Sequence, residues 1–170
     1  YNVAGVSGGT TYYYRVRADK TSLTGQGANS NTITFSTLPA APGNGLNFDG
    51  TNDYVAVPTT TNIPVGNAVY TMEAWMLART QVSNGNGNGI VGWGNYGTNN
   101  QVNAFKYQNN SLGNYWWGND LSVVVGNITG KWHHVACSFD GTTRKIYLDG
   151  VLIGSDTPTG HNVPNANNFR

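Results

Sequence analysis

The acidic residues of this sequence are spaced for turns rather than for catalysis. Its one glutamate, Glu73, stands in a strand-like stretch that contains no second carboxylate. Four aspartates lie in or beside Asx-Gly turns: Asp49, Asp53, Asp140 and Asp149. A typical glycosidase needs two carboxylates, one as the acid and one as the base or nucleophile. The sequence offers no such pair, no Ser-His-Asp set and no metal-ligand cluster, so we expect no catalytic residues and no enzyme activity in this chain.

The histidines and the cysteine also favour structural roles. His133 and His134 are adjacent in a strand-like run, so their side chains point to opposite faces and cannot both bind one metal ion without distortion. If that run lies beside the strand of Glu73, then Glu73 and His134 are placed to form a pair. Cys137 is the only cysteine, which excludes an intrachain disulfide and a Cys-based zinc site. Its apolar surroundings predict a small buried side chain.

A cluster of aromatic residues is the main binding signal. Six of them fall within 25 positions, interleaved with Asn and Gly: Trp93, Tyr96, Tyr107, Tyr115, Trp116 and Trp117. Sugar-binding pockets combine such apolar rings with a few polar groups that bond hydroxyls. We therefore take the six as candidate carbohydrate-binding residues, and ordinary packing with one exposed ring remains the alternative. In a strand only one of Trp116 and Trp117 can enter the core, so at least one should be exposed beside Tyr115 and Asn109-Asn110.

Composition excludes several other classes of partner. The formal net charge is +1, and charged residues make up only 10% of the chain, which gives no electrostatic footprint for nucleic acid or anionic lipid. No stretch approaches 18 uninterrupted apolar residues, so we expect no insertion into a membrane. Few lysines, one glutamate, one cysteine and many Asn and Thr residues fit an extracellular β-protein that does not rely on disulfides.

The elements that position these residues are short strands joined by turns. Alternating apolar residues or short apolar runs predict strands at residues 46–48, 54–57, 70–76, 90–93, 102–107, 121–125, 132–139, 145–148 and 151–154. Asp149-Gly150 is a strong signal for a two-residue hairpin. No segment has a helical period, so the pattern predicts an all-β antiparallel sandwich or jelly roll. Its core should contain Tyr70, Met72, Ala74, Val135, Cys137 and Phe139.

The first residues form a separate pattern. Runs at 12–18 and 31–36 flank a polar, Gly-containing segment and predict a hairpin. Residues 6–18 together with 30–37 resemble the end of a fibronectin type III domain, which is an immunoglobulin-like sandwich, and Tyr12 falls at the position of its tyrosine corner. We therefore divide the chain into the C-terminal part of such a domain at 1–39, a Pro/Gly-containing linker at 40–45 and a second domain at 46–170.

The second domain has a stronger resemblance. Residues 46–55, 70–76, 130–141 and 146–151 are similar, in order and spacing, to the strands of a laminin-G-like, concanavalin-A-like jelly roll. The resemblance implies a final strand that the sequence lacks, so both ends are expected to be cut from a longer protein. It also makes calcium possible at the sheet rim, where Asp49 and Asp53 are the candidate ligands. No other cofactor is indicated.

The tandem of the two domains resembles stretches of large secreted or surface-anchored bacterial proteins, so we predict a non-catalytic extracellular recognition or adhesion module of such a protein. Its partner would be a glycan or an extracellular protein, and we favour carbohydrate. Two alternatives stay open. In the first, the chain is an accessory domain of a secreted hydrolase whose catalytic domain lies outside this chain. In the second, it is a structural spacer without a ligand.

Overall fold

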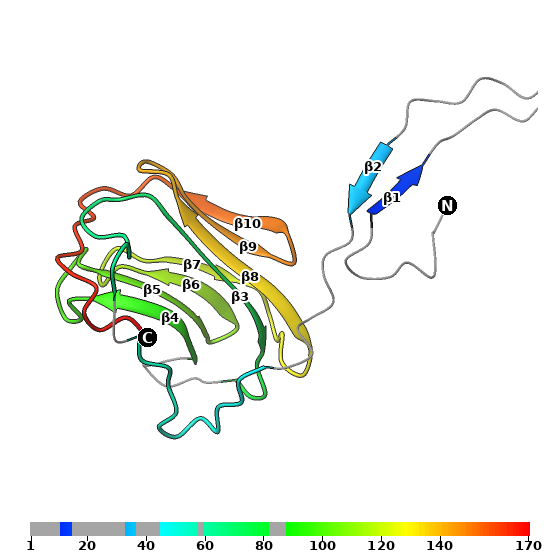
Figure 1. The fold of residues 1–170 in the computed structure, drawn as a ribbon, viewed down its shortest axis with the longest axis horizontal. Helices are drawn as coiled ribbons and strands as arrows, with labels where there is room; N and C mark the ends of the chain where they lie inside the picture. Colours follow the sequence, from blue (N-terminus) through cyan, green and yellow to red (C-terminus); the bar gives the residue numbers. More distant parts are fainter. Residues whose placement is uncertain (1–10, 15–32, 37–44, 58–59, 82–87) are drawn as a thin grey trace, which may run out of the picture. The chain divides into compact units, whose positions relative to one another are not determined.

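The computed structural model describes residues 11–14, 33–36, 45–57, 60–81 and 88–170. The chain divides into two compact units, Tyr1–Asn47 and Phe48–Arg170, which we treat separately. The regular structure of the described residues consists of β-strands (Figure 1). Accordingly, this part of the chain has no helix long and apolar enough to cross a membrane.

The described residues of the first unit form an antiparallel strand pair. Strand β1 (Thr11–Tyr14) pairs with β2 (Ile33–Ser36), with Thr11 opposite Ser36 and Tyr14 opposite Ile33. The predicted pairing of the two runs is thus confirmed. The segment between the strands and residues 40–44 of the predicted linker lie outside the described residues.

The second unit is built from two four-stranded antiparallel sheets (Figure 1). The first sheet has the order β10-β9-β8-β3 and contains β3 (Tyr70–Leu77), β8 (Trp132–Phe139), β9 (Arg144–Leu148) and β10 (Val151–Asp156). The second sheet has the order β4-β5-β6-β7 and contains β4 (Asn88–Gly94), β5 (Val102–Gln108), β6 (Ser111–Tyr115) and β7 (Leu121–Val124). The predicted all-β sandwich is therefore confirmed.

Two sequence predictions of strands were wrong, and one strand was missed. Residues 46–48 and 54–57 form no strand, and their apolar side chains are exposed, with 73% of Leu46 and 67% of Tyr54 accessible. An alternating pattern indicates that a segment favours the β conformation. A strand also needs a neighbouring strand whose backbone forms hydrogen bonds with it. A backbone bond from the Val57 amide to the Phe169 carbonyl, 3.3 Å long, joins this segment to the last residues. The missed strand is β6.

The adjacent histidines of β8 diverge as predicted. The Nδ1 atom of His133 lies 2.8 Å from Oδ2 of Asp149, whereas Nε2 of His134 lies 3.6 Å from Oε2 of Glu73. The expected Glu73–His134 pair is therefore present. Because the glutamate side chain is 66% exposed, water screens this pair and its contribution to stability is small. The predicted hairpin is also present, with positive φ at both Asp149 and Gly150.

The core lies between the two sheets. The residues predicted to point inward from β3 and β8 do so: Tyr70, Met72, Val135, Cys137 and Phe139 are buried, and Ala74 is partly buried. The facing sheet contributes Phe105, Tyr107 and Leu112 to the same cluster, and Trp116, just after β6, completes it. Burial raises the pKa of the Cys137 thiol far above its usual range, so this cysteine is a core residue and not a reactive thiolate.

A polar network lies within this core around the ring of Trp116. The guanidinium carbon of Arg144 lies 4.3 Å from the Trp116 ring centroid. The ring of His161 stacks on Trp116 with centroids 3.8 Å apart and planes 11° apart. The indole N–H donates to the Tyr70 hydroxyl at 3.0 Å, and that hydroxyl donates to Oδ1 of Asn114 at 2.6 Å. The network joins β3 of one sheet to β6 of the other.

Arg144 has no solvent exposure, and its donors are distributed over several acceptors. Its Nε and Nη2 atoms donate to the two carboxylate oxygens of Asp156 at 3.1 and 2.6 Å. Its Nη1 atom donates to the backbone carbonyls of Asn114 and Asn119 at 3.3 and 3.0 Å. The guanidinium thereby connects β9 and β10 to both sides of the turn between β6 and β7.

We expect Phe139→Ala to lower the free energy of unfolding by about 3–5 kcal/mol, because it empties a buried site against the rings of Tyr70, Trp116 and His161. Denaturant titration of both proteins measures the difference. Val124→Ala, at a position 80% exposed on β7, is the control and should cost less than about 1 kcal/mol. A loss below 1 kcal/mol for Phe139→Ala would contradict the assigned strand phase.

We also expect stability to fall as the pH is lowered from about 6.5 to about 4. Burial, with a smaller effect from the charge of Arg144, lowers the pKa of His161 from 6.5 to about 4. Between these values the unfolded chain binds a proton at this position and the folded chain does not, so acid favours unfolding. His161→Phe keeps a ring on Trp116 and should flatten this part of the pH profile.

The comparison of the two pH profiles isolates His161, because His133 and His134 are present in both proteins. Unfolding free energies measured from pH 7.5 to pH 4 should diverge below about pH 6.5. Parallel profiles would show that protonation of His161 is not linked to folding.

Candidate functional site

Three of the six candidate aromatic residues lie in the core. Trp93, Tyr107 and Trp116 are buried, and their polar atoms are bonded within the protein. The Trp93 indole donates to the Pro64 carbonyl at 2.8 Å, and the Tyr107 hydroxyl donates to the Gly126 carbonyl at 3.1 Å. A ring without accessible surface has no face for a sugar. For these three residues the structure therefore supports the packing alternative, and the candidate site narrows to Tyr96, Tyr115 and Trp117.

These three remaining rings meet on the outer face of the β4–β7 sheet, and we call them the aromatic strip. Tyr115 and Trp117 contact edge to face, with ring centroids 5.5 Å apart. Tyr96, which is 38% exposed, comes from the loop after β4, and its hydroxyl lies where a side chain at Gly92 would point. Ala104 stands opposite both Gly92 and Tyr115 in the sheet, so the two tyrosines approach one another over it.

The backbone at Trp117 is held in an unfavourable conformation. Its φ of 65° is left-handed, which costs about 1–2 kcal/mol for a residue with a side chain. The turn is fixed on both sides, since the Trp116 amide donates to Oδ1 of Asp120 at 2.8 Å and the Asn100 amide donates to the Trp117 carbonyl at 3.2 Å. Trp116 is buried and Trp117 is partly exposed, so one of the pair leaves the core as predicted. The predicted reason, alternation within a strand, was wrong, because both residues follow the end of β6 and Trp117 turns outward through its left-handed backbone.

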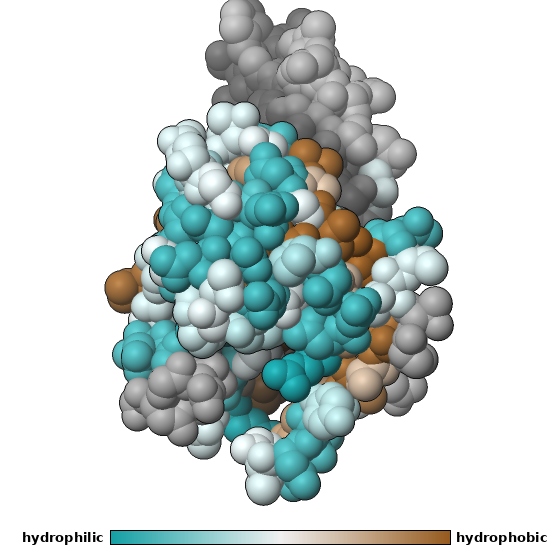
Figure 2. Space-filling model, turned by 90° about the vertical axis from the view of Figure 1, so that its left-hand side faces the viewer, coloured by the Kyte–Doolittle hydropathy of each residue, from teal (hydrophilic) through white to brown (hydrophobic). Residues whose placement is uncertain are grey.

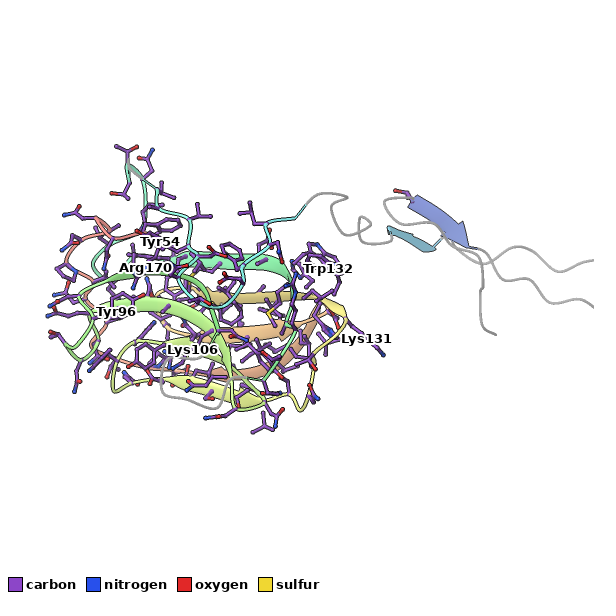
Figure 3. All side chains as sticks on the ribbon, turned by 90° about the horizontal axis from the view of Figure 1, so that it is seen from below. Tyr54, Tyr96, Lys106, Lys131, Trp132 and Arg170 are labelled. Carbon is purple, nitrogen blue, oxygen red and sulfur yellow. The ribbon has the colours of Figure 1, made fainter. Side chains whose placement is uncertain are left out.

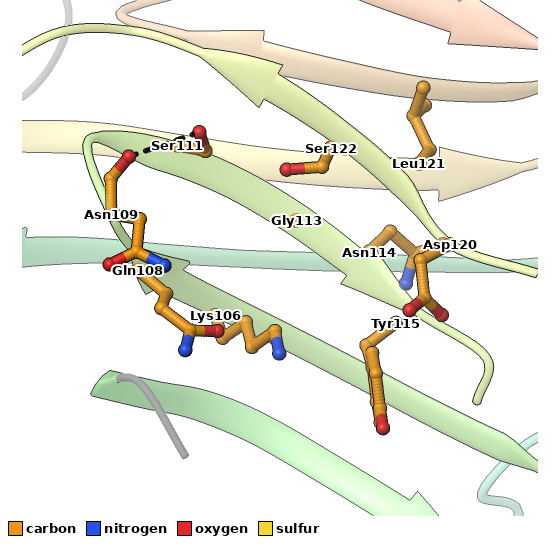
Figure 4. Close-up of a pocket in the computed structure, with 10 residues that line it drawn as sticks. All are labelled: Lys106, Gln108, Asn109, Ser111, Gly113, Asn114, Tyr115, Asp120, Leu121 and Ser122. Atoms are coloured by element: carbon orange, nitrogen blue, oxygen red, sulfur yellow. Dashed lines mark hydrogen bonds between the residues drawn. The ribbon is translucent and has the colours of Figure 1, made fainter. Parts of the chain in front are cut away.

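A groove of about 320 Å³ has Tyr115 of the aromatic strip in its lining (Figure 4). Its lining includes the outward side chains of three strands: Lys106 and Gln108 of β5, Ser111 and Tyr115 of β6, and Ser122 of β7. Gly113 stands between Lys106 and Ser122 in the sheet and forms the floor. An added Cβ at Gly113 would be in ordinary van der Waals contact, 3.7 Å from the Leu121 carbonyl oxygen and 3.8 Å from Cγ of Lys106, so the Lys106 stem packs over this position.

Charged and hydroxyl groups border the strip and the groove. The Lys106 Nζ lies 4.2 Å from the Tyr115 ring centroid, and the Arg170 guanidinium carbon lies 6.0 Å from the Tyr96 centroid. In the view of Figure 3, Tyr96, Lys106 and Arg170 lie on one side of the second unit and Lys131 and Trp132 on the other. Burial raises the pKa of both tyrosines, and the charge of Asp120 raises that of Tyr115 further. Both phenols therefore stay protonated at neutral pH and can donate hydrogen bonds.

A second hollow, of about 360 Å³, lies between the edge strands β3 and β4. Its lining is mainly apolar and includes Ile63, Met72, Ile90 and Phe169. Hydrophobic side chains are also exposed in a band beside the largely hydrophilic face seen in Figure 2. The hollow offers fewer groups that could bond sugar hydroxyls than the groove on the β4–β7 sheet does.

The candidate calcium ligands Asp49 and Asp53 bond the backbone of their own turn. Oδ2 of Asp53 accepts the Asp49 amide at 2.8 Å, and Oδ1 of Asp49 accepts the Thr51 amide at 2.7 Å, so both carboxylates cap their own turn. Calcium takes six to eight oxygen ligands. Across the described ranges, no group of three or more His, Cys, Asp or Glu side chains is placed to hold a metal ion.

The comparisons with known proteins agree with the fold. A protein-family model of the laminin G type, described as the Concanavalin A-like lectin/glucanases superfamily, matches residues 49–170. No curated protein and no solved structure matches the chain. The fibronectin type III resemblance of residues 1–39 lies outside the matched range and stays a prediction. Since the match spans well over half of the chain, including both four-stranded sheets and the aromatic strip, the chain belongs to the Concanavalin A-like lectin/glucanases superfamily.

Proposed function

We propose that this chain is a non-catalytic carbohydrate-recognition module that binds its ligand on the outer face of the β4–β7 sheet. The observation that carries the proposal is the aromatic strip, in which Tyr96, Tyr115 and Trp117 come from three separate positions to one face beside an open groove. Membership of a superfamily that contains lectins supports binding as the general function.

The chemistry of the face suits a sugar. A pyranose has apolar CH groups on its faces and hydroxyls around its rim, so it is recognised by rings together with groups that donate and accept hydrogen bonds. The groove supplies the amides of Gln108 and Asn109 and the hydroxyls of Ser111 and Ser122. The protonated phenol of Tyr115 adds a further donor beside them.

The carboxylates at this face support recognition without hydrolysis. Asp120 is the only carboxylate among the residues that line the groove, and its Oδ1 atom accepts the Trp116 amide. Hydrolysis of a glycoside by the usual route needs two carboxylates on either side of the bond. A recognition role of this kind fits a secreted or surface protein that meets glycans outside the cell, whether it acts in adhesion or as the accessory domain of a hydrolase.

We expect Trp117→Gly to weaken glycan binding at least about tenfold, because it removes one of three stacking rings. Glycine relieves the left-handed strain at this position, which offsets the lost contact with Tyr115, so the unfolding free energy should change by less than about 1 kcal/mol. A glycan array identifies a ligand for the full chain, and calorimetry then measures both proteins. Trp132→Ala, at a tryptophan 43% exposed on the other sheet, is the control and should retain affinity.

We expect Gly113→Val to abolish binding of the same glycan while leaving the protein folded. The new side chain occupies the floor of the groove and points away from the core, and valine is favoured in a strand. Thermal unfolding and calorimetry check the two effects separately. Two outcomes would contradict a binding site on the β4–β7 face. One is an array that yields no ligand. The other is binding that survives both Gly113→Val and Trp117→Gly but is lost in Trp132→Ala.

A further inference from the structure

We propose that the saccharide bound on this face is acidic, with its carboxylate or sulfate group held by Lys106 and Arg170. The inference rests on the proposed carbohydrate function and names the class of sugar. It comes from the position of the two cations, each of which lies over a ring of the aromatic strip.

Lys106 places a positive charge where a neutral sugar would otherwise stack. Its stem follows the groove floor, with Cγ and Cε 3.8 and 3.9 Å from the position of a Cβ at Gly113, and its Nζ lies 4.2 Å from the Tyr115 centroid. The ammonium is attracted to the electron-rich face of that ring. A neutral pyranose has to displace it to lie on this face of Tyr115. An acidic sugar can leave it in place and pair with it.

Arg170 provides the second cation at the Tyr96 end of the strip. Its backbone is fixed against the edge strand β4, because the Arg170 amide donates to the Gly92 carbonyl at 3.1 Å and the Gly92 amide donates to the Arg170 carbonyl at 2.8 Å. The guanidinium lies 6.0 Å from the ring of Tyr96, which itself lies over Gly92. A guanidinium can bind a carboxylate or a sulfate through two parallel hydrogen bonds.

Neither cation is neutralised by the protein within the described ranges. The ion pairs found there join Arg144 to Asp156 and Lys145 to Asp140, and the other two involve histidines. Lys106 and Arg170 take part in none of them. Asp120 is the carboxylate among the residues that line the groove; its Oδ1 atom accepts the Trp116 amide at 2.8 Å at the β6–β7 turn, and its charge acts on Tyr115. Because this carboxylate repels an anion, we place the acidic group of the ligand at Lys106 of β5.

The test compares ligands with matched backbones and different charge, using the full chain. Polygalacturonic acid is set against its methyl ester, and dextran sulfate against dextran, so that the carboxylate and sulfate forms are read separately. At least one acidic polymer should bind tenfold or more tightly than its neutral counterpart at 50 mM salt. This advantage should shrink at 500 mM salt, because the interaction is electrostatic.

Two lysine variants separate the specific site from general charge. Lys106→Gln should reduce the affinity for the acidic polymer to the affinity for the neutral one. Arg170→Gln should also lower the affinity for the acidic polymer. Lys131→Gln removes the same charge from an exposed loop position away from the strip and should change nothing (Figure 3). Thermal unfolding confirms that each variant is folded.

The outcomes distinguish this inference from the function on which it rests. Equal binding of acidic and neutral polymers, lost in Trp117→Gly, overturns the acidic preference and leaves carbohydrate recognition standing. Polyglutamate binding as tightly as the acidic saccharide, with no effect of Trp117→Gly, shows simple attraction of polyanions and overturns the inference. Failure of every saccharide to bind overturns both proposals.

Discussion

The position of Trp116 between Arg144 and His161 is the contact on which the rest of the second unit depends. Its indole joins the two sheets through the Tyr70 hydroxyl, so the core cannot separate without breaking that bond. The same inward ring fixes the chain on either side of it. With Trp116 inside, the neighbouring Tyr115 and Trp117 lie on the outer face, and the arrangement of the core thus decides which aromatic rings a ligand can reach.

The buried charge of Arg144 explains why the turn that carries Trp117 keeps its unfavourable geometry. A guanidinium without solvent contact is costly unless its donors are satisfied. Here Asp156 and the carbonyls of Asn114 and Asn119 satisfy them. The two carbonyls stand on either side of the β6–β7 turn, so relaxing the turn would leave donors of a buried charge unpaired. The cost of the left-handed residue is smaller than that penalty, and the strained conformation persists.

Local patterns predicted the parts of the fold that depend on local chemistry. Alternation placed β8 correctly, and Asp149-Gly150 marked the hairpin between β9 and β10 because both positions need positive φ. Strand β6 was missed because Gly113 and the inward Asn114 do not read as a strand; the Asn114 side chain is satisfied by Tyr70, a partner 44 residues away. The aromatic cluster was found, but its buried and exposed members could not be separated, since burial depends on which face of a distant sheet each ring meets.

Two glycines of the candidate site were not identified from the sequence. Gly92 and Gly113 lie in strands, where glycine packs poorly and weakens the sheet. The core does not require either of them, because both lie on the outer face in register with Ala104 and Lys106. Gly92 gives room to the Tyr96 hydroxyl, and Gly113 lies at the groove floor under the stem of Lys106. Glycine at these two outward positions serves the outer surface and not the core, which agrees with the binding site that we propose on that face of the sheet.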